Sequence, residues 1–136
     1  PNDLVLGGDT IVYIDAQVLG KPGSKEEAAE MLRRIAGRTH QVYTGIALYH
    51  PVSRAISQDV DVTSVTMKDM DDREIRWYVE TGEPMDKAGS YALQGVGGFF
   101  VTKVCGDFSG VVGLPLPKVY GLLRRAGDSL EQIGML

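Results

Sequence analysis

Asp9 is the first side chain in this sequence whose type and neighbours suggest chemistry. It follows Leu4-Val5-Leu6, a short apolar run that predicts a buried strand ending at Gly7-Gly8. Ligand sites in α/β proteins favour the carboxyl ends of strands. A carboxylate at such a place can bind Mg²⁺ or take a proton from water. An ordinary aspartate in a turn explains the same spacing, so both interpretations are open at this stage.

Lys21 is a second candidate, because it lies between Gly20 and Pro22. The proline restricts the backbone next to the lysine, which helps to place a positive charge against a phosphate. Most lysines in such a setting are simply solvated, and the spacing alone does not separate the two interpretations.

A loop punctuated by glycines, residues 82–95, is the third candidate. It carries Glu83, Asp86, Lys87 and Gln94. Loops on a rigid frame are where binding and catalytic sites are usually built, and glycines let a ligand approach the backbone closely. The other interpretation is a charged surface connection.

The elements that must position these residues can be predicted from periodicity and capping signals. Ser24 and Asp71, each followed three residues later by glutamate, predict two capped helices that end at Gly37 and Gly82. We expect a β-hairpin over residues 39–67, a strand over 99–105, a loop over 106–113, and a third helix entered at Pro115 and Pro117. This mixture predicts an α/β fold class, with a mixed sheet and flanking helices.

Composition limits the classes of protein that remain. A length of 136 residues, with 43% hydrophobic and 24% charged residues, is typical of one soluble globular domain. No apolar run approaches the roughly 20 residues that cross a bilayer, so we expect no membrane partner. The net charge of −4 argues against bulk binding of DNA or RNA, which needs a basic face. The lone Cys105 suits a reducing compartment, so we expect a cytoplasmic protein.

Several short motifs follow one another along the chain. They are Gly7-Gly8-Asp9-Thr10-Ile11-Val12, Leu19-Gly20-Lys21-Pro22, Gly37-Arg38-Thr39-His40, Thr44-Gly45, Gly82-Glu83-Pro84 with Asp86-Lys87-Ala88-Gly89, Gln94-Gly95 and Gly113-Leu114-Pro115. Their order and spacing resemble those of the Maf family, the septum-formation-inhibitor-like nucleoside triphosphate pyrophosphatases. The resemblance covers nearly the whole chain, from about Leu4 to Leu123.

The resemblance implies a cleft fold related to the inosine triphosphate pyrophosphatases, and an enzyme that cleaves the α–β phosphate bond of a nucleoside triphosphate. It implies a divalent metal, Mg²⁺ or Mn²⁺, and a homodimer. Asp9 matches the catalytic acid, which activates water or holds the metal, and Lys21 and Lys87 match the phosphate-facing lysines. Thr10 together with Gln94 resembles the branch acting on dTTP and UTP, whereas the branch acting on 7-methyl-GTP usually carries Gln and Glu at those positions.

One family segment has no counterpart in this sequence. The family opens with a strand leading to a Ser-x-Ser-Pro-Arg-Arg segment whose arginines grip phosphate, and no Ser-Pro-Arg-Arg occurs in the 136 residues. We therefore expect a single Maf-like domain over residues 1–136 that is incomplete at its N-terminus. The alternative function is a non-catalytic module that binds a nucleotide or a partner protein and regulates cell division or growth.

Overall fold

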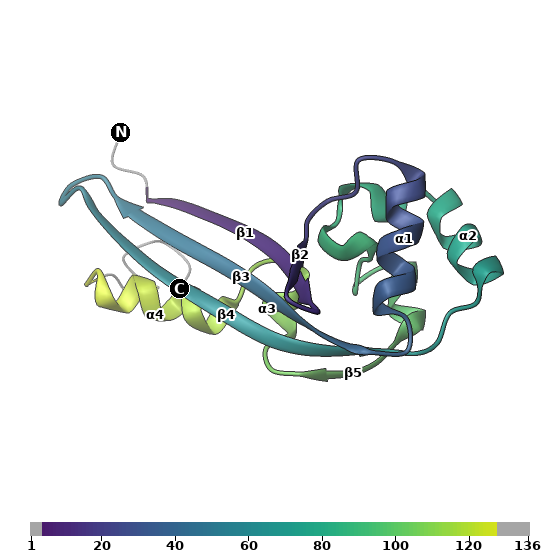
Figure 1. Cartoon of the computed structure of the whole chain (residues 1–136). Coiled ribbons are helices and arrows are strands. Elements are labelled where there is room, and N and C mark those ends of the chain that lie inside the picture. The colour runs from purple at the N-terminus through teal and green to yellow at the C-terminus, as the bar shows by residue number, and fades with distance from the viewer. Residues whose placement is uncertain (1–3, 128–136) are drawn as a thin grey trace.

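A long twisted sheet forms the frame of the molecule in the computed structural model, which describes residues 4–127 (Figure 1). Its strands are β1 (Val5–Ile14), β2 (Gln17–Leu19), β3 (Thr39–His50), β4 (Ala55–Met67) and β5 (Val101–Cys105), in the spatial order β2-β1-β3-β4-β5. The predicted α/β class, a sheet with flanking helices, is confirmed. Each pair of neighbouring strands in this sheet is antiparallel, whereas the sequence predicted a mixed sheet.

Helices cover one face of this sheet in two groups. The α-helices are α1 (Lys25–Ile35), α2 (Asp72–Glu80), α3 (Phe108–Val112) and α4 (Leu116–Arg125), and three 3₁₀ turns are η1 (Glu83–Asp86), η2 (Ala88–Ser90) and η3 (Val96–Phe100). Figure 1 shows α1, α2 and the 3₁₀ turns gathered at one end of the sheet, with α4 lying along β4 at the other. None of the helices within residues 4–127 is long and apolar enough to cross a membrane.

The β3–β4 hairpin is the best predicted element. Residues of β3 alternate between buried and more exposed from His40 to Leu48, as expected when one face of a strand packs against a core. Val42 belongs to the core beneath α1 and α2, and Ile46 and Leu48 pack with α4. One row of β3 side chains therefore serves both apolar clusters, and the residue between them lies where the clusters meet.

Both predicted helix starts are confirmed by their hydrogen bonds. The Ser24 hydroxyl accepts the Glu27 amide at 3.1 Å, and the Glu27 carboxylate accepts the Gly23 amide at 3.1 Å. At α2, Asp71 and Glu74 each accept the other's amide, which completes a capping box. These bonds satisfy amide groups that the first turn of a helix leaves without partners.

Two local predictions are wrong. β1 does not stop at Gly7-Gly8 but continues to Ile14, because β3 pairs with it from Val5 to Tyr13 and β2 pairs with Ile14. Asp9 therefore lies inside a strand rather than after one. Residues 106–113 are not simply a loop, since Asp107 caps the short helix α3 by accepting the Ser109 amide at 2.9 Å. An isolated helix of one turn has too little periodicity to be read from sequence.

Candidate active site

One cavity of about 630 Å³ collects all the candidate residues singled out from the sequence. This volume falls in the range of small-molecule sites, about 300–1,000 Å³. The residues predicted for the site all line it: Asp9, Thr10, Lys21, Lys87 and Gln94. The structure thus brings together groups from three separate stretches of the chain. Their chemical roles remain predictions.

β1 contributes Asp9 and Thr10 to the cavity wall. On one side β1 pairs with β3 throughout this region, but β2 pairs with it only from Val12 to Ile14. Among the described residues, the edge of β1 next to Asp9 therefore has no strand partner on that second side. The Asp9 side chain is exposed, and one of its oxygens accepts the Thr10 amide at 2.9 Å. A carboxylate held at an open strand edge is accessible to a metal ion or to water.

The two lysines are brought together by a backbone hydrogen bond. Lys21 follows β2, and the neighbouring Gly20 carbonyl accepts the Gly89 amide at 3.1 Å. Gly89 adopts a φ of 70°, and a Cβ there would lie 2.6 Å from a Val12 methyl carbon. Only glycine lets this turn lie so close to β1, and the turn carries Lys87 into the cavity.

The loop that carries Gln94 is held by a carboxylate. Glu83 accepts hydrogen bonds from the Val96 and Gly97 amides, both at 2.9 Å, and from the Tyr78 hydroxyl. Burial raises the pKa of the Glu83 carboxyl, but these hydrogen bonds outweigh burial and hold that pKa below its usual value. Glu83 is thus an ionised anchor for the Gln94 loop. The sequence showed Glu83 only as a charged loop residue and did not predict that it holds the Gln94 loop.

A buried polar pair, Tyr91 and His40, lies at the cavity wall. Tyr91 lines the cavity, and its hydroxyl lies 2.6 Å from Nε2 of His40, which is fully buried. Burial lowers the pKa of His40 to about 4 and raises the pKa of Tyr91. Both side chains are therefore neutral at physiological pH.

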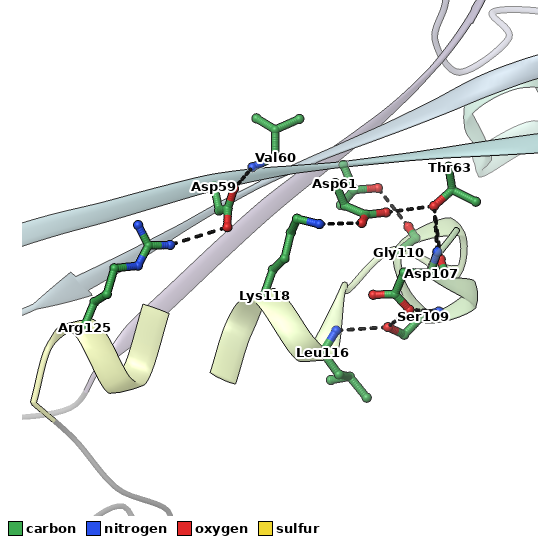
Figure 2. A network of polar contacts seen from close by, with 11 residues as sticks. Asp59, Val60, Asp61, Thr63, Asp107, Ser109, Gly110, Leu116, Lys118 and Arg125 are labelled. Carbon is green, nitrogen blue, oxygen red and sulfur yellow. Dashed lines mark hydrogen bonds and ion pairs between the residues drawn. The ribbon is translucent and has the colours of Figure 1, made fainter. Parts of the chain in front are cut away.

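The part of the cavity wall formed by α3 was not predicted from the sequence. Val111 and Val112 of α3 line the cavity. Figure 2 shows how α3 is fixed beneath β4: the Thr63 hydroxyl accepts the Asp107 amide at 3.0 Å, and Gly110 lies beside Asp61. No local pattern could have indicated this wall, because it depends on contacts between residues more than 40 positions apart.

The charges of the cavity suit a metal–phosphate complex better than a bare metal ion. Its charged lining consists of the acids Asp9, Glu83 and Asp86 and the lysines Lys21 and Lys87. Glu83 is occupied by the hydrogen bonds that hold the Gln94 loop. Within residues 4–127, no group of three or more His, Cys, Asp or Glu side chains is placed to hold a metal ion. Mg²⁺, however, is commonly held by one or two carboxylates together with substrate phosphates, and Asp9 fits that pattern.

The fold and this cavity define an α/β protein whose cleft is lined by both charged and apolar side chains and is built from a strand edge and Gly-rich turns. A family model described as "Maf-like protein" matches residues 1–126. The chain is 49% identical over 127 residues to a protein named dTTP/UTP pyrophosphatase from Clostridium tetani, covering 93% of this chain and 66% of the relative. Proteins of the same name from Koribacter versatilis and Escherichia coli O157:H7 are 48% and 51% identical, covering 93% and 88% of this chain and 65% and 59% of those relatives.

The chain therefore belongs to the family of Maf-like proteins. It spans slightly less than two thirds of the length of the Clostridium tetani and Koribacter versatilis relatives.

Proposed function

We propose that this protein is a nucleoside triphosphate pyrophosphatase that hydrolyses the α–β phosphate bond of dTTP, UTP or a similar pyrimidine nucleotide. The observation that carries the proposal is the presence of Asp9, Lys21 and Lys87 in one cavity. The names of the relatives, all dTTP/UTP pyrophosphatases, support the substrate class.

The proposed chemistry assigns each residue one task. Asp9 accepts a proton from water, and the water oxygen attacks the α-phosphorus. The bond from that phosphorus to the α–β bridging oxygen breaks, so the products are a nucleoside monophosphate and pyrophosphate. Lys21 and Lys87 stabilise the negative charge that develops on the phosphoryl oxygens, which is the dominant contribution in phosphoryl transfer.

A divalent metal, Mg²⁺ or Mn²⁺, is the proposed cofactor. A triphosphate brings about four negative charges, and two lysines alone do not neutralise them in a cavity that also contains acids. Asp9 is the residue that would hold the ion, with the phosphates as the remaining ligands. When bound, the ion supplies charge neutralisation for the phosphates and a low pKa for a coordinated water.

The proposal also covers domain organisation, base selection, oligomeric state and location. We propose that the chain forms one Maf-like domain, because both apolar clusters pack on the same sheet. Thr10 and Gln94 are the proposed contacts that select the pyrimidine base, and both line the cavity. A homodimer and a cytoplasmic site of action remain predictions.

Release of pyrophosphate tests the proposal. The purified protein is supplied with Mg²⁺ and, in turn, dTTP, UTP, CTP and GTP, and pyrophosphate is quantified. We expect turnover that is fastest with dTTP or UTP. Asp9→Asn should lower kcat by about 100-fold or more, because it removes the proton acceptor. Lys21→Met and Lys87→Met should each lower kcat/KM by at least about tenfold.

Lys25→Met is the matched control for the lysine variants. Lys25 is exposed on α1, pairs with Glu80 at 3.2 Å and lies outside the cavity, so its loss should leave kcat/KM unchanged. Full activity in Asp9→Asn would remove Asp9 from the mechanism. Nucleotide binding without pyrophosphate release would favour the alternative, a non-catalytic nucleotide-binding regulator.

A further inference from the structure

Thr44 is a buried polar residue at the junction of the two apolar clusters. It is fully buried on the inward row of β3, where its neighbours Val42 and Ile46 belong to different clusters. Burying a hydroxyl costs free energy unless it forms hydrogen bonds. If this position only had to fill the core, a β-branched residue without a hydroxyl, such as valine, would suffice. We therefore expect the hydrogen bonds of the Thr44 hydroxyl to have a function.

The Thr44 hydroxyl has two partners. Its oxygen lies 2.8 Å from the Gly110 carbonyl of α3 and 3.0 Å from the Thr10 hydroxyl, which faces it across the β1–β3 pair. A carbonyl oxygen can only accept, so the single proton of Thr44 must point to Gly110. The proton between the two threonines must then come from Thr10.

This direction fixes what Thr10 can offer to a ligand. Once its only proton is directed to Thr44, the Thr10 hydroxyl has only acceptor lone pairs left for the cavity that it lines. We infer that Thr44 is a positioning residue that sets Thr10 as a hydrogen-bond acceptor, so that the ligand group opposite Thr10 must be a donor. This inference rests on the proposed function for the identity of the ligand.

Two parts of a bound nucleotide complex could supply such a donor. One is the imide N3–H of uracil or thymine, and the other is a water held by the metal ion. Both would be repelled if Thr10 instead directed its proton into the cavity. The polarity set by Thr44 thus contributes to recognition although Thr44 itself touches no ligand.

Thr44→Val separates this effect from the packing of α3. Valine has nearly the shape of threonine, and the Gly110 carbonyl still accepts the Gly113 amide at 3.1 Å. The start of α3 is held independently by the bond between Thr63 and Asp107. The variant should therefore fold with α3 in place, while the Thr10 hydroxyl becomes free to rotate. Thr44→Ser, which keeps the hydroxyl, is the matched control.

The hydrogen-bond direction can be measured without a ligand. Neutron diffraction from crystals of the deuterated protein should place the Thr44 deuteron towards the Gly110 carbonyl and the Thr10 deuteron towards Thr44. A Thr44 deuteron directed at Thr10 would overturn the inference.

Binding of α,β-methylene-UTP with Mg²⁺, measured by calorimetry, tests the consequence. Thr44→Val and Thr10→Val should each weaken binding by about five- to tenfold, the effect of one hydrogen bond, and Thr44→Ser should bind as the wild type does. If the donor is the imide, the loss vanishes with the N3-methylated analogue. If it is metal-bound water, the loss persists with that analogue and vanishes without Mg²⁺.

Two results separate the inference from the proposed function. Wild-type affinity in Thr44→Val, or equal losses in Thr44→Val and Thr44→Ser, would contradict a positioning role for the Thr44 hydroxyl. If the wild type binds no nucleotide analogue, the proposed function fails, and the neutron measurement still decides the polarity of the Thr10 hydroxyl.

Discussion

Lowering the pH should destabilise the fold through His40, which contacts the cavity residue Tyr91. Its Nε2 atom is hydrogen-bonded to the Tyr91 hydroxyl, and its Nδ1 atom is buried with no hydrogen-bond partner among residues 4–127. Burial lowers the pKa of His40 to about 4. The folded protein therefore resists protonation of this imidazole, whereas the unfolded chain takes up the proton at an ordinary pKa of about 6.5.

The size of the loss in unfolding free energy follows from the difference between the folded-state and unfolded-state pKa values of His40. Below about pH 6.5 the unfolded state binds more protons, so the stability that neutral His40 provides is complete above that pH and declines as the pH falls. The decline continues to the folded-state pKa of about 4 and then stops. From pH 7 to pH 5 the free energy of unfolding should fall by about 2 kcal/mol because of this group alone.

Urea unfolding at pH 7, 6 and 5 measures this loss. His40→Gln keeps a polar group that can meet Tyr91 but cannot take up a proton. The fall in unfolding free energy between pH 7 and pH 5 should therefore be about 2 kcal/mol smaller in His40→Gln than in the wild type. His50→Gln, which removes the other histidine, should retain most of the wild-type dependence. Equal pH dependence in the wild type and His40→Gln would refute this reasoning.

Two further substitutions test how the turns of the cavity are held. Glu83→Gln should lower Tm by about 5 °C and kcat/KM by about tenfold, because the amide cannot accept from Val96, Gly97 and the tyrosine hydroxyl as a carboxylate does; thermal melts and kinetics equal to the wild type would contradict this. Gly89→Ala should destabilise the protein by about 2 kcal/mol in urea, since its Cβ would meet Val12 and the residue has a positive φ. An unchanged urea midpoint would show that the turn can shift at little cost.

The parts of the fold that were predicted correctly are those encoded locally. Segments rich in β-branched and aromatic residues predict the β3–β4 hairpin, and the pairs at Ser24 and Asp71 predict the two capped helices. The continuous β1 was missed because Gly7 and Gly8 have low strand propensity, and only the partner strand β3 keeps them extended. The pairing of β1 with β3 in the folded protein thus outweighs the low strand propensity of the two glycines.

The candidate site, too, could be predicted from the sequence only in part. The residue types of Asp9, Lys21 and Lys87 could be singled out from the sequence, with their family roles taken from the resemblance. The hydrogen bonds that hold these side chains in place could not be predicted, because strand register and the docking of α3 depend on contacts between residues far apart in the sequence. Thr44 illustrates this: only the pairing of β1 with β3 places its hydroxyl against Thr10.

The site of bond cleavage tests the central claim most directly. Hydrolysis of UTP with Mg²⁺ in heavy-oxygen water should transfer the label to UMP, leaving pyrophosphate unlabelled, and Asp9→Asn should form both products at least about 100-fold more slowly. Label in inorganic phosphate or in pyrophosphate would mean that water attacks a different phosphorus. That result would contradict the assignment of this cavity to cleavage of the α–β bond.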